Sequence, residues 1–154
     1  MLPSAYNSNM QIVQSPAYVA IEMEMIHDVR VIATNGRPHP DKNIRQWYGD
    51  SIGHWEGDAL VVDTTNFTDQ TPFPGAQNLH VVERLTRVDP DSILYQFTVE
   101  DPGMWTKPWS GELVITKIPG QLYEYACHEA NYGLMNTLRG ARVAEAETAK
   151  KTAK

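Results

Sequence analysis

The chain has 154 residues and a mass of 17.3 kDa, which is the size of one domain that can bury its own core. Its 13 lysines and arginines against 19 aspartates and glutamates leave no basic stripe for a phosphate backbone, which argues against a nucleic-acid partner. The longest apolar runs, such as residues 59–62, are far shorter than the ~20 residues of a membrane span, and one cysteine excludes an internal disulfide.

The first third of the chain alternates apolar and polar residues in short runs, which is typical of antiparallel strands. The alternation predicts strands over residues 11–14, 18–25 and 30–33, and a turn at Asn35-Gly36. The pattern is lost from Arg37 to Asp50, where only a helical turn over residues 43–47 is predicted.

The rest of the chain reads as successive hairpins. Glu56-Gly57-Asp58 predicts a turn between a short strand that carries Trp55 and a longer one that carries Leu60 and Val62. Further strands are predicted over 79–88, 93–99, 110–116 and 122–127, and residues after Asn131 read as a helical tail that frays.

Eight or nine strands joined by hairpins predict an all-β fold, because closing such a meander removes its exposed edges. A small antiparallel up-and-down barrel of the lipocalin or calycin kind is expected over residues 1–140, and a charged tail over 141–154. A β-sandwich is the alternative.

Four stretches, "GHWEGDALVVDTTNF", "LHVVERLTRVD", "TVEDP…TKPW" and "YEYACHEANYG", resemble a family of largely uncharacterised exported proteins of soil bacteria, acidobacteria among them. The resemblance runs along nearly the whole chain and carries no established activity. It implies a periplasmic or secreted location. Such relatives have a long preceding segment with a secretion signal, so the chain is expected to be part of a longer precursor or a stand-alone version. No signal peptide is read in the chain itself.

Four residues are candidates for acid–base catalysis because each lies near a predicted strand end: Glu24, His27, His80 and His128. Each histidine lies close to a carboxylate in the sequence, and a rim that gathers the strand ends would bring them together. The alternative is that Glu22 and Glu24 face water and that the histidines only cap or hydrogen bond. Cys127 is disfavoured as a nucleophile because adjacent strand residues point to opposite faces, away from His128.

Other residues are candidates for ligand binding. The tryptophans could stack on a sugar or aromatic ring or could simply fill the ends of a barrel. Glu124 shares a strand face with His128, and Arg84 could clamp a carboxylate or pair with a neighbouring acid. The set is Glu22, Arg84, Glu124, Trp47, Trp105 and Trp109.

The leading functional hypothesis is a small-molecule hydrolase or lyase with glutamate and histidine acid–base chemistry in a barrel pocket. One alternative is a non-catalytic module for a carbohydrate or aromatic ligand. Another is a mononuclear metalloprotein in which His27, His80 and His128 hold one Zn, Cu or Fe ion, although no metal-binding spacing is present in the sequence. The sequence leaves open whether the protein forms a homodimer, and no membrane partner is expected.

Overall fold

A computed structural model of the chain describes residues 9–25, 28–70, 78–124 and 132–152. The predictions made for His27, Cys127 and His128 lie outside these residues. The chain divides into two compact units, Met1–Tyr123 and Glu124–Lys154. The first unit contains the β-sheet, and the second contains the helix α1 (Gly133–Thr152).

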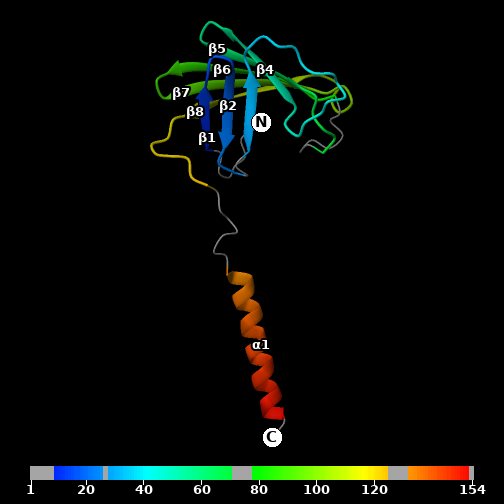
Figure 1. Ribbon diagram of the computed structural model, residues 1–154, viewed down its shortest axis with the longest axis vertical. Helices are drawn as coiled ribbons and strands as arrows, with labels where there is room; N and C mark the ends of the chain where they lie inside the picture. The colour runs from blue at the N-terminus through cyan, green and yellow to red at the C-terminus, as the bar shows by residue number, and fades with distance from the viewer. Residues whose placement is uncertain (1–8, 26–27, 71–77, 125–131, 153–154) are drawn as a thin grey trace. The chain divides into compact units, whose positions relative to one another are not determined.

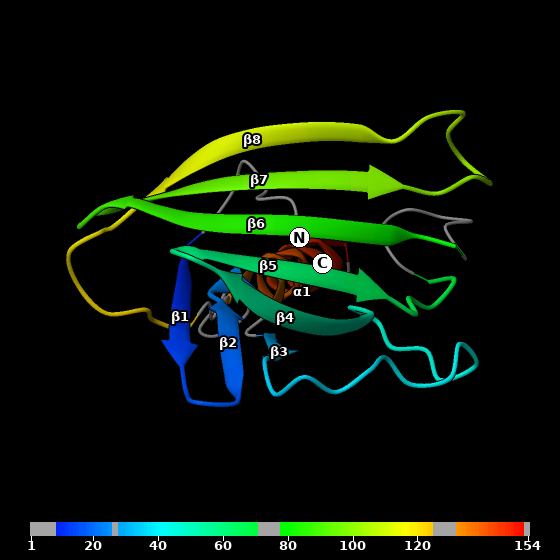
Figure 2. The ribbon, with the colours of Figure 1, turned by 90° about the horizontal axis from the view of Figure 1, so that it is seen from above.

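The sheet of the first unit has eight strands that follow one another in chain order. They are β1 (Met10–Gln14), β2 (Tyr18–Met23), β3 (Val29–Ala33), β4 (Asp50–Glu56), β5 (Ala59–Thr65), β6 (His80–Asp89), β7 (Ser92–Glu100) and β8 (Trp109–Thr116). Figures 1 and 2 show β1–β3 running across β4–β8, so the sheet curls as a half-barrel. The predicted all-β barrel fold with a helical tail is therefore confirmed.

The core lies on the inner face of the curled sheet, between β1–β3 and β4–β8. Strand residues of one parity point inward, as the alternation predicted for Val19 and Ile21 on β2 and for Leu60 and Val62 on β5. The buried apolar cluster consists of Val19, Ile21, Ile32, Leu60, Val62, Leu79, Leu85, Tyr95, Phe97 and Val99. Residues of the other parity on β4–β8 form what we call the outer face.

A buried ion pair crosses the inner face. The guanidinium of Arg30 forms two hydrogen bonds with the Glu83 carboxylate, one of them 2.8 Å long, and also donates to Thr64 Oγ1 at 2.6 Å and Ser51 Oγ at 3.0 Å. Tyr95 Oη donates to Glu83 at 2.7 Å. Burial opposes ionisation of Glu83, but Arg30 outweighs it and lowers the pKa of this carboxyl to about 2. The polar groups of the pair are thus satisfied inside the core.

The space beside this ion pair leaves little room for a ligand. The cavity beside Arg30 and Glu83, with walls that include Met23 and Leu113, has a volume of about 30 Å³. That space suits roughly one water molecule, whereas ligand pockets usually measure about 300–1,000 Å³. Among the described residues, the cavity beside this ion pair is therefore too small to be the ligand pocket expected in a barrel.

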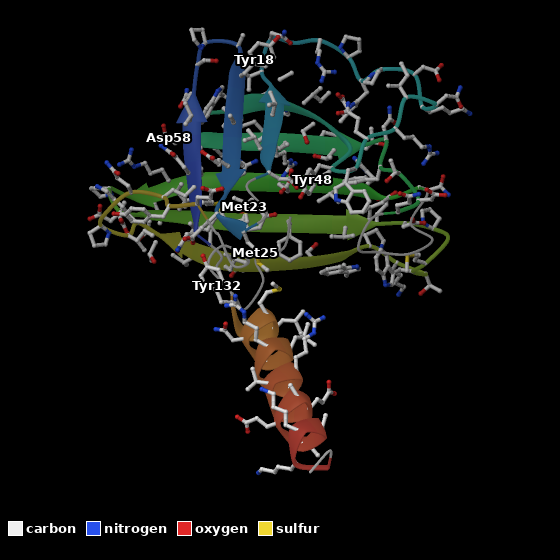
Figure 3. The ribbon with its side chains drawn as sticks, turned by 60° about the horizontal axis from the view of Figure 1, so that its bottom comes forward. Tyr18, Met23, Met25, Tyr48, Asp58 and Tyr132 are labelled. Atoms are coloured by element: carbon white, nitrogen blue, oxygen red, sulfur yellow. The ribbon has the colours of Figure 1, made fainter. Side chains whose placement is uncertain are left out.

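The crossover over residues 34–49 joins β3 to β4, which pair in parallel through Ile32–Ser51 and Ala33–Ile52. A hairpin cannot join parallel strands, so a long connection is needed here. Gly36 has a φ of 77°, as the predicted turn requires, but residues 43–47 form no helix and that prediction is wrong. Tyr48 fixes the end of the crossover by donating to Asp28 Oδ2 at 2.6 Å (Figure 3). Burial, followed by this bond, raises the pKa of Tyr48 to about 12.

The predicted last strand is wrong where the structure describes it. β8 ends at Thr116, Gly120 turns the backbone with a φ of 116°, and residues 122–124 form no strand. Tyr123 is 71% exposed. In α1 every residue whose burial is described is exposed. Among the described residues, no helix is long and apolar enough to cross a membrane.

Candidate functional site

Two aspartates and two histidines form a continuous line of hydrogen bonds, which we call the Asp–His chain: Asp50, His39, Asp63 and His80. His39 Nδ1 lies 2.7 Å from Asp50 Oδ2, and His39 Nε2 lies 3.1 Å from Asp63 Oδ1. The other oxygen of Asp63 lies 3.1 Å from His80 Nε2. Asp63 therefore bridges two imidazole rings.

The strand register brings three of these residues together on the outer face. Asp63 lies opposite Val82 on β6, and His80 is two positions before Val82, so Asp63 and His80 are diagonal neighbours. Asp50 lies opposite Thr65, two positions after Asp63, and is the diagonal neighbour on the other side. Leu60, Val62 and Thr64 are buried, so alternation turns Asp63 outward.

The fourth residue, His39, comes from the crossover. Pro38 and Pro40 flank it and keep this segment out of the sheet, since proline cannot donate to a strand ladder. Asn66 Nδ2 donates to the carbonyl oxygens of Pro40 and Asp41, both at 3.2 Å, which ties the crossover to the end of β5. The imidazole of His39 is thereby placed between Asp50 and Asp63.

The Asp50 end of the Asp–His chain is anchored and buried. Arg37 donates to both carboxylate oxygens of Asp50, at 3.0 and 2.6 Å. Burial works against ionisation of Asp50, but the hydrogen bonds from Arg37 and His39 hold the pKa of its carboxyl below the ordinary value. Asp50 is therefore a fixed negative charge that orients the His39 ring.

The other end is accessible. The exposed fraction of the side chains rises from 6% at Asp50 and 22% at His39 to 37% at His80. The His39 ring is held on both sides, by Asp50 at Nδ1 and by Asp63 at Nε2, and it thereby fixes the position of Asp63. His80 donates from Nε2 to Asp63, and its Nδ1 forms no hydrogen bond within the described part of the chain. An oriented imidazole with an open nitrogen is suited to taking up a proton.

Of the four predicted catalytic residues, His80 lies in the Asp–His chain and Glu24 does not. Glu24 follows the end of β2, and its carboxylate accepts a hydrogen bond of 2.6 Å from Asn9. His27 and His128 lie outside the described residues, and so do two of the three predicted metal ligands. The structure therefore does not test that metal site.

The predicted ligand-binding residues of the first unit are not gathered in one place. Glu22 is half-buried on β2, Glu124 is exposed in the second unit, and Trp47 is 49% exposed in the crossover. The rings of Trp105 and Trp109 pack edge to face with their centroids 5.8 Å apart, and both side chains pack against the core. These two tryptophans therefore fill the end of the sheet. Arg84 donates to Glu56 Oε2 at 2.7 Å.

The sequence analysis does not predict three residues of the Asp–His chain as site residues, namely Asp50, His39 and Asp63. Alternation along β5 was sufficient to turn Asp63 outward. The position of His39 depends on the path of the crossover, which has no periodic pattern from which it could be predicted. The acid that pairs with Arg84 is Glu56 on the neighbouring strand, whereas the adjacent Glu83 faces the other way and pairs with Arg30.

Comparison with protein-family models, with curated proteins and with solved structures finds no match. Among the described residues, no group of three or more histidine, cysteine or acidic side chains is arranged to hold a metal ion. In the Asp–His chain the ring nitrogens point at carboxylate oxygens rather than at a common centre.

Proposed function

We propose that the protein is a small-molecule hydrolase or lyase in which His80 is the general base and Asp63 orients it. The observation that carries this proposal is the Asp–His chain itself: a buried, arginine-paired aspartate at one end and an accessible imidazole at the other. A solvated surface histidine needs no such support.

The proposed chemistry begins at His80 Nδ1. This nitrogen takes a proton from a bound water, and the resulting hydroxide attacks the substrate, or it takes the proton directly from a substrate carbon. Asp63, already bonded to Nε2–H, stabilises the imidazolium that forms. The imidazolium then returns the proton to the leaving group, which regenerates the base.

Asp63 can serve in this way only if its own position is fixed. His39 holds the second oxygen of Asp63, Asp50 holds His39, and Arg37 holds Asp50. Each link removes rotational freedom from the next side chain, so the His80 ring is preorganised before substrate binds.

The proposed site lies on the outer face, because Asp63 and His80 are on the opposite strand face from the buried Val62, Thr64 and Glu83. A periplasmic or secreted location is part of the proposal and rests on the resemblance of the four motif stretches to exported proteins.

The test is a turnover screen with chromogenic esters, phosphate monoesters and glycosides on the wild type and two histidine variants. His80→Gln should lower kcat/KM about 10²–10⁴-fold with any substrate that is turned over, since that is the usual contribution of a general base. The matched control is His54→Gln, because His54 is an exposed β4 residue that hydrogen bonds to Glu56 at 3.1 Å and is not part of the Asp–His chain. Wild-type turnover by His80→Gln would contradict the proposal, and no turnover of any substrate would favour the non-catalytic binding module.

A further inference from the structure

We infer that the ligand of this site is a neutral saccharide, bound on the outer face in the depression beside Asp63. The inference rests on the proposed function for the chemistry at His80, but the binding surface is argued from different residues.

The depression lies over β5–β8, and its lining includes Val82, the residue opposite Asp63 in the strand register. It has a volume of about 530 Å³, within the usual range for ligand sites, and its outer-face lining includes Val61, Val82, Arg84, Gln96, Thr98 and Ser110. The register joins it to the catalytic residues, because Asp63, Val82, Thr98 and Ser110 lie opposite one another on four successive strands. A ligand in the depression therefore reaches Asp63 along one row of the sheet.

The polar side chains of the depression come in pairs that retain hydrogen-bonding capacity. Thr98 Oγ1 and Ser110 Oγ are 2.8 Å apart, and Gln96 Nε2 donates to Glu112 Oε2 at 3.2 Å. After these bonds form, the hydroxyl and carboxylate groups still have open acceptor positions, and the Gln96 amide can still donate. Sugar hydroxyls, which both donate and accept, match such a mixed set.

Two valines complete the surface. Val61 on β5 and Val82 on β6 are diagonal neighbours in the strand register, and both line the depression. Their methyl groups provide an apolar floor for the C–H face of a pyranose ring, while the hydroxyls at its rim reach Thr98 and Gln96.

Charge selects against an anionic ligand. The carboxylates of Glu56, Asp63 and Glu112 lie on this face, and the guanidinium of Arg84 is already engaged by Glu56. A phosphate or carboxylate ligand would meet repulsion from these three carboxylates, and the guanidinium that lines the depression, that of Arg84, already has its charge compensated by Glu56. An uncharged polyhydroxylated ligand avoids this cost.

The experiment is a titration of the ¹⁵N-labelled full chain, followed by NMR, with maltotriose, cellotriose, xylotriose and chitotriose, and with phenyl phosphate as the anionic probe. At least one trisaccharide should shift the amide resonances of Thr98 and Ser110, and phenyl phosphate should not. Thr98→Val should weaken that binding roughly fivefold to tenfold, the value of one hydrogen bond of about 1 kcal/mol. Thr86→Val is the matched control, since Thr86 is an outward β6 residue outside the depression, and it should bind as the wild type does.

Absence of binding by every trisaccharide, binding of phenyl phosphate in their place, or equal affinity of Thr98→Val and wild type would each overturn the saccharide site. If a non-saccharide substrate is turned over in a His80-dependent way, the proposed function stands and the saccharide site fails. If a trisaccharide binds at Thr98 but His80→Gln leaves turnover unchanged, the saccharide site stands and the catalytic proposal fails.

Discussion

A single carboxylate, Glu83 on β6, connects three strands by accepting hydrogen bonds from Arg30 on β3 and Tyr95 on β7. Glu83→Gln removes the negative charge and leaves the guanidinium of Arg30 buried without a counter-ion. We expect the variant to lose about 3–5 kcal/mol of unfolding free energy, measured by urea denaturation, because that is the usual cost of breaking a buried ion pair. Glu112→Gln, an exposed glutamate on β8, is the control and should unfold at the wild-type urea concentration. Equal stability of the two variants would contradict a structural role for the pair.

The Glu83 carboxylate also makes the unfolding free energy depend on pH. Its pKa falls from the ordinary 4.5 to about 2 in the folded chain, so between about pH 4.5 and pH 2 the unfolded chain binds a proton that the folded chain does not. The unfolding free energy should therefore be full above pH 4.5 and fall as the pH is lowered through this window. Tyr95→Phe removes one hydrogen bond to the ionised carboxylate, so its pKa depression, and hence the acid loss, should be smaller. Superimposable pH curves for Tyr95→Phe and wild type, measured as unfolding free energies, would argue against this assignment.

The crossover over residues 34–49 is the element on which the Asp–His chain depends, and Gly49 closes it. Gly49 has a φ of 68°, and a Cβ there would lie 2.5 Å from the Thr65 carbonyl oxygen. Gly36 also has a positive φ, but a Cβ there would meet nothing within 4 Å. Both alanine variants should lose the roughly 1–3 kcal/mol of a left-handed residue, and Gly49→Ala should lose more.

The additional cost at Gly49 has a functional consequence that can be measured separately. Moving residue 49 away from β5 also moves Asp50, its neighbour in the chain, and loosens the contact with His39. We therefore expect Gly49→Ala, and not Gly36→Ala, to shift the ring resonances of His39 in the NMR spectrum. Equal unfolding free energies and unchanged ring resonances in both variants would show that the backbone accommodates a side chain at Gly49.

These elements also show where sequence reasoning succeeds. Period-2 alternation identified seven of the eight strands and located Leu60 and Val62 on the inner face, because burial of one strand face leaves a direct mark on residue type. β4 was recognised only as the short strand before the Glu56-Gly57-Asp58 turn. The parallel pairing of β3 and β4 left no such mark, since it depends on the path of an irregular crossover. For the same reason the sequence does not indicate His39 as a site residue, whereas it does indicate His80 as a catalytic candidate.

The molecule as a whole places a packed interior and an accessible polar face on the same sheet. A lipocalin-like interpretation puts the ligand inside, but the inner face of this half-barrel holds ten buried apolar residues and a satisfied ion pair. Alternation cannot distinguish a strand face that lines a cavity from one that faces outward, because both are polar. That choice depends on how far the sheet curls, which is a property of all eight strands together.

The division into two units leads to a prediction about the helix. The buried apolar cluster consists of residues of the sheet unit alone, and every residue of α1 whose burial is described is exposed. Deletion of residues 133–154 should leave the urea midpoint unchanged when it is followed by tryptophan fluorescence, because all four tryptophans lie in Met1–Tyr123. Far-UV circular dichroism should show the loss of the helical signal in the same samples. Gly49→Ala serves as the comparison that must lower the midpoint. A lower midpoint in the deletion variant would mean that residues 133–154 contribute to the stability of the sheet unit.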